Sequence, residues 1–94
     1  PAWRDYLAMD SGLNIRLANG DEDAAVIQRL ARLGAAEAPH GPALLAEVDG
    51  EAVAAIGFVD GHAVADPSRA NASLLSLLRL RRLETRAIAF VFGA

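Results

Sequence analysis

The sequence contains few side chains that could take part in catalysis. Three could act as a general base beside a substrate, namely Glu47, His62 and Asp66. His62 directly follows a turn glycine, and Asp66 precedes Pro67, an arrangement typical of turns and caps. Glu47 alternates with apolar neighbours, as a residue on the solvated face of a strand does. Each position has a structural explanation, so we predict no catalytic residue.

The two histidines and the first residue raise two further chemistries. His40 and His62 stand at unrelated positions in a chain without cysteine, which is no metal-ligand pattern, and we predict no metal. Tautomerases use a free N-terminal proline as their base, and Pro1 invites that comparison. Those enzymes begin on a strand, however, whereas residues 1–9 have helical spacing. We expect a short N-terminal helix there instead.

Charge is unevenly distributed along the chain. The net charge of −3 divides into −7 for residues 1–66 and +4 for residues 67–94, and all nine basic residues are arginine. Such asymmetry can mark a polyanion site or a complementary contact between copies. No aromatic residues are interleaved among Arg79, Arg81, Arg82 and Arg86, as they would be in a single-strand binder. We therefore expect no nucleic-acid partner.

Length and hydropathy limit the class of protein. A chain of 94 residues, 53% hydrophobic and 22% charged, predicts one folded domain over residues 1–94. No apolar run approaches the roughly 20 residues of a transmembrane helix, and Arg4 and Asp5 do not suit a secretory signal. The lack of cysteine fits a reducing compartment. We expect a cytoplasmic protein.

Two Asp-Gly pairs organise the middle of the chain. Asp49-Gly50 and Asp60-Gly61 separate three short apolar runs, Leu44–Val48, Ala52–Val59 and His62–Ala65. Asp-Gly supplies the positive φ angles that tight hairpin turns need. The pattern predicts a three-stranded antiparallel meander.

A strand and a helix are predicted before this meander. Period-two alternation over Leu13–Leu17 indicates a half-buried strand. Asn19 or Asp21 can then cap a helix, and Gly34 can end it in a left-handed conformation. Two prolines and a glycine make residues 35–42 a loop.

A leucine-rich helix is predicted after the meander, from a cap at Asn71 or Ser73 to about Thr85. Its leucines cover nearly the whole circumference, so it must be sandwiched or meet a partner. Arg79, Arg82 and Arg86 share one side of it. Ala87–Phe92 then reads as a final strand.

Together these elements predict an α/β domain with a mixed, mostly antiparallel sheet. The predicted order is strand, helix, three strands, helix and strand. Its predicted core consists of Ile15, Leu17, Val26, Leu30, Val48, Ile56, Phe58, Leu74 and Leu78.

This order resembles the N-terminal two-thirds of the GNAT acetyltransferase fold. Ile15–Ala18 followed by Asp23–Ala25 resembles that superfamily's first strand and helix entry, and Leu45–Ala54 resembles its next hairpin. Residues 43–69 with the leucine helix also resemble short, uncharacterised actinobacterial proteins that look like abbreviated members of the superfamily. The resemblance covers roughly residues 13–92.

The resemblance implies a place for acyl-CoA. In GNAT enzymes a glycine-containing loop before a helix cradles the pyrophosphate with backbone N–H groups. The matching cofactor-binding residues here are Arg69, Ala70, Asn71, Ala72 and Ser73. Ala72 and Leu74 occupy the glycine positions, where a Cβ should crowd the pyrophosphate, and the family's acceptor-binding elements do not follow. We expect no cofactor, with weak acyl-CoA binding as the alternative.

Two functions from different classes follow. The first is a non-catalytic, GNAT-derived protein-interaction or oligomerisation module. Its partner, expected to be another copy of the chain, would contact the Leu74–Leu83 helix and the Ala87–Phe92 strand. The alternative is a minimal acyl-CoA-binding N-acyltransferase with a degenerate pyrophosphate loop, and a titration with acetyl-CoA separates the two.

Overall fold

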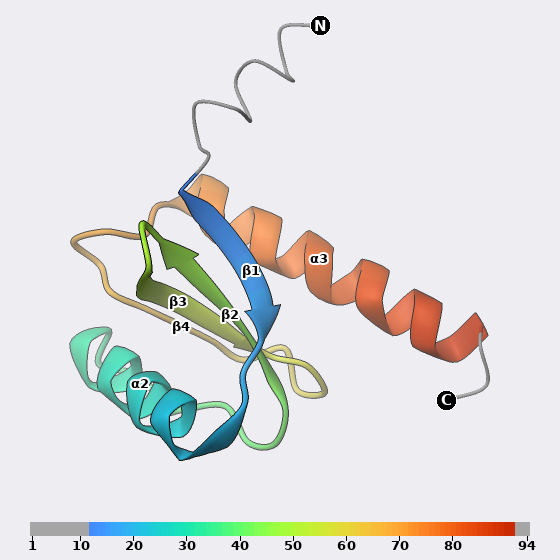
Figure 1. Cartoon of the computed structure of the whole chain (residues 1–94), viewed down its shortest axis with the longest axis horizontal. Helices are drawn as coiled ribbons and strands as arrows, with labels where there is room; N and C mark the ends of the chain where they lie inside the picture. Colours follow the sequence, from blue (N-terminus) through green and yellow to red (C-terminus); the bar gives the residue numbers. More distant parts are fainter. Residues whose placement is uncertain (1–11, 92–94) are drawn as a thin grey trace, which may run out of the picture.

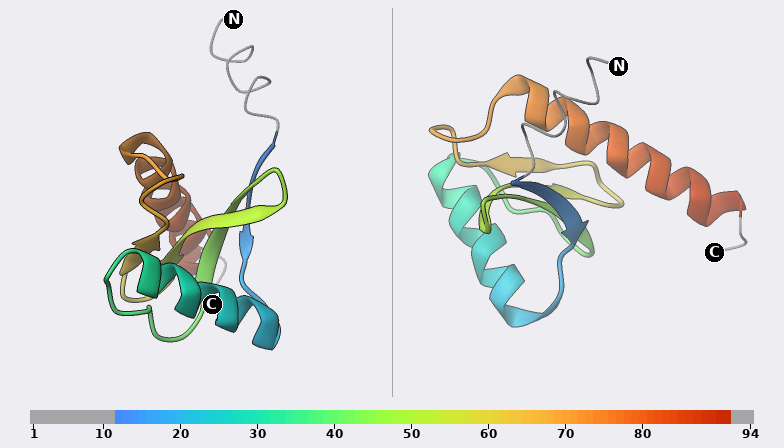
Figure 2. Two further views of the ribbon diagram at one scale, coloured as in Figure 1. Left: turned by 90° about the vertical axis from the view of Figure 1, so that its left-hand side faces the viewer. Right: turned by 45° about the horizontal axis from the view of Figure 1, so that its top comes forward.

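The computed structural model describes residues 12–91, which form a four-stranded antiparallel sheet with one helix on each face (Figures 1 and 2). The elements are β1 (Leu13–Leu17), α2 (Gly20–Leu33), β2 (Ala43–Val48), β3 (Glu51–Gly57), β4 (Ala63–Ala65) and α3 (Ala72–Val91). The strands lie in sequence order, so β1 and β4 form the two edges. The predicted α/β class and the order from the first strand to the leucine helix are confirmed.

The two predicted hairpins have different turns. Between β2 and β3, Asp49 and Gly50 have φ of 53° and 83°, the consecutive positive angles of a tight two-residue turn. Between β3 and β4, only Gly61 has a positive φ, 69°, and the connection spans residues 58–62. There the Gly61 N–H donates to the Gly57 carbonyl at 3.0 Å. The prediction of a tight turn is therefore confirmed at the first pair and wrong at the second.

The strands direct alternate residues to the two helices, and a β-bulge in β3 interrupts this alternation once. The register between β2 and β3 shifts at Ala46/Glu47, so Val53 is an extra residue on β3. Consequently Val53 and its neighbour Ala54 both pack in the cluster under α3. The buried residues on the α2 face are Ile27, Leu30, Ala31, Ala43, Leu45, Ala55 and Val64. Those on the α3 face are Leu44, Ala46, Val53, Ala54, Ile56 and Leu78.

Seven of the nine predicted core residues belong to the two hydrophobic clusters, and Phe58 and Leu17 do not. Leu30, Ile56 and Leu78 are fully buried, and Ile15, Val26, Val48, Phe58 and Leu74 are half-buried. Leu17, however, is 55% exposed. It ends the edge strand β1, while α3 packs mainly against β2 and β3. Alternation placed Leu17 on the correct face but could not show that the helix leaves this corner uncovered.

The leucine helix is longer than predicted. Asn71 caps it, since its side-chain oxygen accepts a hydrogen bond from the Leu74 N–H at 2.9 Å. The helix then continues to Val91, so the predicted strand at Ala87–Phe92 is wrong over its described residues. Thr85 lies within the helix, and its hydroxyl donates to the Arg81 carbonyl one turn back, at 2.8 Å. No glycine or proline interrupts residues 72–91.

Two further predictions concern the remaining segments. Residues 35–42 form the expected loop between α2 and β2. The helix predicted over residues 1–9 lies outside the described residues.

Candidate functional site

The predicted cofactor-binding residues lie at the junction of β4 and α3: Arg69, Ala70 and Asn71 end the connection, and Ala72 and Ser73 begin α3. Asp66 closes this turn, because its carboxylate accepts hydrogen bonds from the Ser68 N–H at 2.9 Å and the Ser68 hydroxyl at 2.7 Å. The same hydrogen bonds lower the pKa of Asp66. Its carbonyl accepts from the N–H groups of Arg69 and Ala70, at 3.1 and 2.9 Å. The turn is thus stabilised by its own donors.

The polar groups at the start of α3 also have partners within the chain. The Arg69 guanidinium pairs with Glu51 of β3. The Asn71 side chain occupies the Leu74 N–H. An anion at this helix terminus would find the Arg69 charge already paired and the Asp66 carboxylate nearby. Acyl-CoA binding at Arg69–Ser73 stays a prediction drawn from the resemblance.

The three candidate bases lie on different elements, each with its own partners. His62 is exposed just before β4, and its N–H donates to the Asp60 carboxylate at 2.9 Å. The His40 N–H donates to the same carboxylate at 3.3 Å. Both bonds lower the pKa of Asp60, the bond from His62 more strongly. Asp66 belongs to the turn between β4 and α3. The Glu47 carboxylate forms an ion pair with Arg16. Within the described residues, no cluster of three or more His, Cys, Asp or Glu side chains could hold a metal ion.

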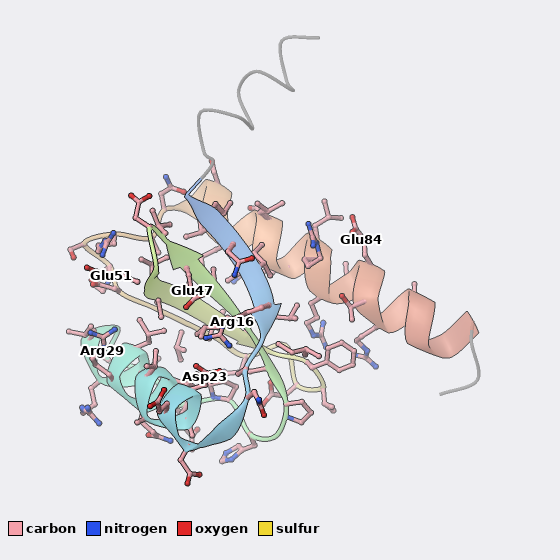
Figure 3. All side chains as sticks on the ribbon, in the orientation of Figure 1. Arg16, Asp23, Arg29, Glu47, Glu51 and Glu84 are labelled. Carbon is pink, nitrogen blue, oxygen red and sulfur yellow. The ribbon has the colours of Figure 1, made fainter. Side chains whose placement is uncertain are left out.

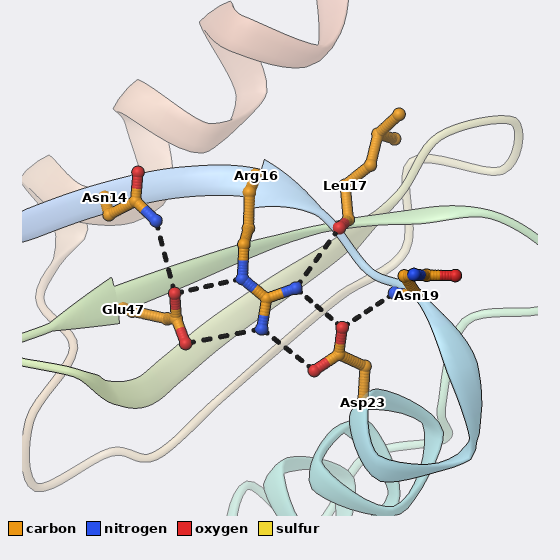
Figure 4. Close-up of polar contacts among 6 residues, drawn as sticks. All are labelled: Asn14, Arg16, Leu17, Asn19, Asp23 and Glu47. Carbon is orange, nitrogen blue, oxygen red and sulfur yellow. Dashed lines mark hydrogen bonds and ion pairs between the residues drawn. The ribbon is translucent and has the colours of Figure 1, made fainter.

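The most extensive polar cluster joins β1, β2 and α2 on one face of the sheet (Figures 3 and 4). Arg16 is at its centre. Its Nη1 and Nη2 donate to the two carboxylate oxygens of Asp23, at 2.6 and 2.9 Å. Its Nε and Nη2 donate to Glu47, at 3.1 and 3.4 Å, and Nη1 also reaches the Leu17 carbonyl at 3.3 Å. We call Arg16, Asp23 and Glu47 the Arg16 cluster.

The Arg16 cluster connects α2 to the strands β1 and β2. A guanidinium has five N–H donors, and the contacts above direct all five at acceptors within the chain. Asp23 also accepts the Asn19 N–H at 2.7 Å, which anchors the start of α2. These contacts raise the pKa of Arg16 and lower that of Glu47. The cluster combines one positive with two negative charges, and all five arginine donors are used. It therefore fixes α2 against β1 and β2 and leaves no arginine donor for a ligand.

Sequence reasoning missed this cluster. It assigned Glu47 to the solvated face of a strand, whereas the side chain is only 19% exposed and paired with Arg16. Arg16 and Glu47 occupy polar positions on neighbouring strands that point to the same face. Polar residues on the same face of neighbouring strands could have predicted this ion pair. The prediction would have required the register between β1 and β2, which the sequence does not show.

The Arg16 cluster makes the stability of the fold depend on pH. The Arg16 and Asn19 hydrogen bonds lower the pKa of Asp23 from 3.8 to about 2. A depressed folded-state pKa contributes stability that is complete above the ordinary pKa and is lost as pH falls through the folded-state value. We expect Asp23→Asn to lower stability at pH 7, and the difference from the unmodified chain to shrink between about pH 5 and pH 2.

Urea unfolding of both chains across this pH range measures the effect. Asp21→Asn, an exposed position in the same helical turn, is the matched control and should follow the unmodified chain. If the free energies of unfolding of Asp23→Asn and of the unmodified chain differed by the same amount from pH 7 down to pH 2, the stabilising role of this carboxylate would be wrong.

The remaining candidate surface is on α3. This helix packs on the sheet through Leu74, Leu75 and Leu78. Arg82 attaches it to the β3–β4 loop, with Nε and Nη2 donating to the carbonyls of Phe58 and Val59, both at 2.9 Å. The helix then extends past the sheet (Figures 1 and 2).

The side of α3 that faces away from the sheet is exposed and partly apolar. Leu80 and Leu83 are 52% and 58% exposed. They lie on one stripe of the helix with smaller exposed residues. We call the stripe of Ser73, Ser76, Leu80, Leu83 and Ala87 the outer face of α3.

Comparisons with known proteins add no identification. No protein-family model, curated protein or solved structure matches the chain. The GNAT resemblance therefore stays a hypothesis. Among the helices of residues 12–91, none is both long and apolar enough to cross a membrane.

Proposed function

We propose that this chain is a non-catalytic association module that binds another protein chain through the outer face of α3. The observation that carries the proposal is the exposure of Leu80 and Leu83, at 52% and 58%, on the side opposite the buried Leu78. Neighbouring exposed leucines on a helix already packed through its other side are typical of a face that meets a partner. In the GNAT-like interpretation, this helix follows the degenerate pyrophosphate loop.

The described site residues support association over catalysis. The Arg16 cluster uses its arginine donors internally, and the candidate bases Glu47, His62 and Asp66 each have different hydrogen-bond partners. The predicted contact through an Ala87–Phe92 strand is wrong, because residues 87–91 are helical. The proposed contact is thus the outer face of α3 alone. The absence of cysteine from the sequence supports a cytoplasmic location for the module.

Replacing both exposed leucines tests the proposal. We expect the 9.8-kDa chain to sediment as a larger species at micromolar concentration, and Leu80→Gln/Leu83→Gln to weaken association at least about tenfold, because each exposed leucine loses its burial in the complex. Leu33→Gln on α2 is the matched control, since Leu33 is 49% exposed and lies on the other helix. A monomeric unmodified chain would contradict the proposal.

The alternative, acyl-CoA binding at Arg69–Ser73, is tested on the same samples. Calorimetric titration with acetyl-CoA should give no binding heat if the chain is only an association module. Heat that disappears in Arg69→Ala and weakens with salt would favour the alternative, because contacts to a pyrophosphate are electrostatic.

A further inference from the structure

The outer face of α3 has the spacing of a coiled-coil seam. Its five residues recur at alternating intervals of three and four, and all are exposed. This is the spacing at which one helix packs along another, with alternate residues entering the gaps of the partner helix. The buried Leu78 points to the sheet instead. The seam is therefore available while the domain keeps its own core.

Two oppositely charged residues flank the seam. Arg79 directly precedes Leu80, Glu84 directly follows Leu83, and both are exposed. Figure 3 shows Glu84 on the side of α3 away from the sheet. Among the described residues, Arg79 makes no ion pair, and Glu84 makes only a long one, 3.8 Å from Arg81. Arg79 and Glu84 are thus open to pairing across an interface.

The spacing of these charges selects the direction of the partner helix. In a parallel pair, the residue preceding a seam position lies beside the residue five places later in the other helix. Arg79 would then meet Glu84 of the second copy, and the two-fold symmetry would repeat this pair. In an antiparallel pair centred between Leu80 and Leu83, Arg79 would lie near Arg86 of the other helix, and like charges would oppose association.

We propose that the partner is a second copy of this chain, bound through parallel, in-register pairing of α3 with α3. Leu80 and Leu83 meet their own counterparts across the two-fold axis, and Arg79 of each copy pairs with Glu84 of the other. This inference rests on the proposed association function. Because only two leucines per helix enter the seam, the expected affinity is in the micromolar range.

Single cysteines test the direction and register, since the natural chain has none. In a parallel in-register pair, position 76 meets position 76, and position 87 meets position 87. Ser76→Cys and Ala87→Cys, each alone, should therefore form disulfide-linked dimers quickly under oxidised glutathione. Gln28→Cys, at an exposed position on α2, is the control and should remain largely uncross-linked. In the antiparallel pair, positions 76 and 87 meet each other, and like positions lie about 16 Å apart.

Charge reversal provides an independent readout. Arg79→Glu and Glu84→Arg should each weaken association roughly three- to thirtyfold, because each disrupts two symmetric exposed pairs. The double variant should restore most of the affinity. These positions are exposed, so the variants should fold normally, as circular dichroism can verify.

The outcomes separate the inference from the proposed function. Cross-linking of each single cysteine with rescue by the double charge reversal supports parallel pairing. Association in which only a mixture of Ser76→Cys and Ala87→Cys cross-links, or in which none does, overturns this inference and leaves the association function standing. A monomer overturns both.

Discussion

Ile56→Ala should destabilise the fold by about 2–5 kcal/mol, the range found when a buried large aliphatic side chain is truncated. Ile56 is 1% exposed and lies on β3, in the core cluster between the sheet and α3. The loss combines the transfer free energy of the removed methyl and methylene groups with the cost of the cavity left beside Leu44 and Leu78. Because domains of this size are stable by only about 5–15 kcal/mol, this loss is a large fraction of the total stability.

Chemical denaturation followed by circular dichroism measures this loss. Val59→Ala, three residues further along the chain, is the matched control, since Val59 is 64% exposed. Its effect should stay within about 0.5 kcal/mol. A loss of less than about 0.5 kcal/mol for Ile56→Ala would show that the Ile56 side chain does not lie in the core between β3 and α3.

The meander and its two flanking helices could be predicted because their signals are local. Asp49-Gly50 specifies a tight turn through its own backbone preferences, and Asn71 caps α3 through a hydrogen bond three residues away. The Asp60-Gly61 turn could not be predicted from its dipeptide. This loop is also held from far along the chain, because Arg82 donates to the carbonyls of Phe58 and Val59 from 24 and 23 residues away.

The end of α3 shows a second limit of local reasoning. Period-two alternation over Ala87–Phe92 predicts a strand, but a strand needs a neighbouring strand to pair with its backbone groups. The helix satisfies the same groups within itself and needs no neighbour. The choice was therefore decided by what lies beside the segment, and the sequence pattern could not show this.

Of the two candidate sites, the sequence indicated the exposed leucines of α3 but not the Arg16 cluster. Leucines around the whole circumference of the helix predicted that some would stay exposed within the domain. Leu80 and Leu83 are exposed. Which leucines these are depends on how α3 is rotated against β2 and β3. The Arg16 cluster was missed because it joins residues from three elements, and only the sheet register places Arg16 beside Glu47.

Gly34 was predicted to end α2 in a left-handed conformation. The helix does end beside Gly34, but the left-handed residue is the next one. Gly34 has φ of −89°, and the left-handed residue is Ala35, with φ of 51°. The Ala36 N–H donates to the Ala31 carbonyl at 2.9 Å, and the Ala35 N–H donates to Arg32 at 3.2 Å. These two hydrogen bonds form a Schellman motif in which alanine occupies the position usually taken by glycine.

Space, not conformation, explains the glycine at position 34. A Cβ added there would lie 2.7 Å from the Ala65 carbonyl oxygen of β4, closer than real Cβ contacts allow. The end of α2 thus approaches the edge strand so closely that only glycine fits. The neighbouring alanine meanwhile bears the cost of a left-handed backbone, about 1–2 kcal/mol for a residue with a side chain.

Exchanging the two residue types one at a time should therefore give unequal effects: only the change at position 34 should destabilise the fold. Gly34→Ala should destabilise by about 1–3 kcal/mol, because α2 or β4 must shift to relieve the contact with the Ala65 carbonyl. Ala35→Gly should be neutral or stabilise by up to about 1 kcal/mol, because relief of the left-handed strain exceeds the added flexibility of the unfolded chain. Thermal and urea unfolding of the two variants give the signs directly. If Gly34→Ala stabilised the fold while Ala35→Gly weakened it, the helix would end as the sequence pattern suggested, and the close approach of α2 to β4 would be wrong.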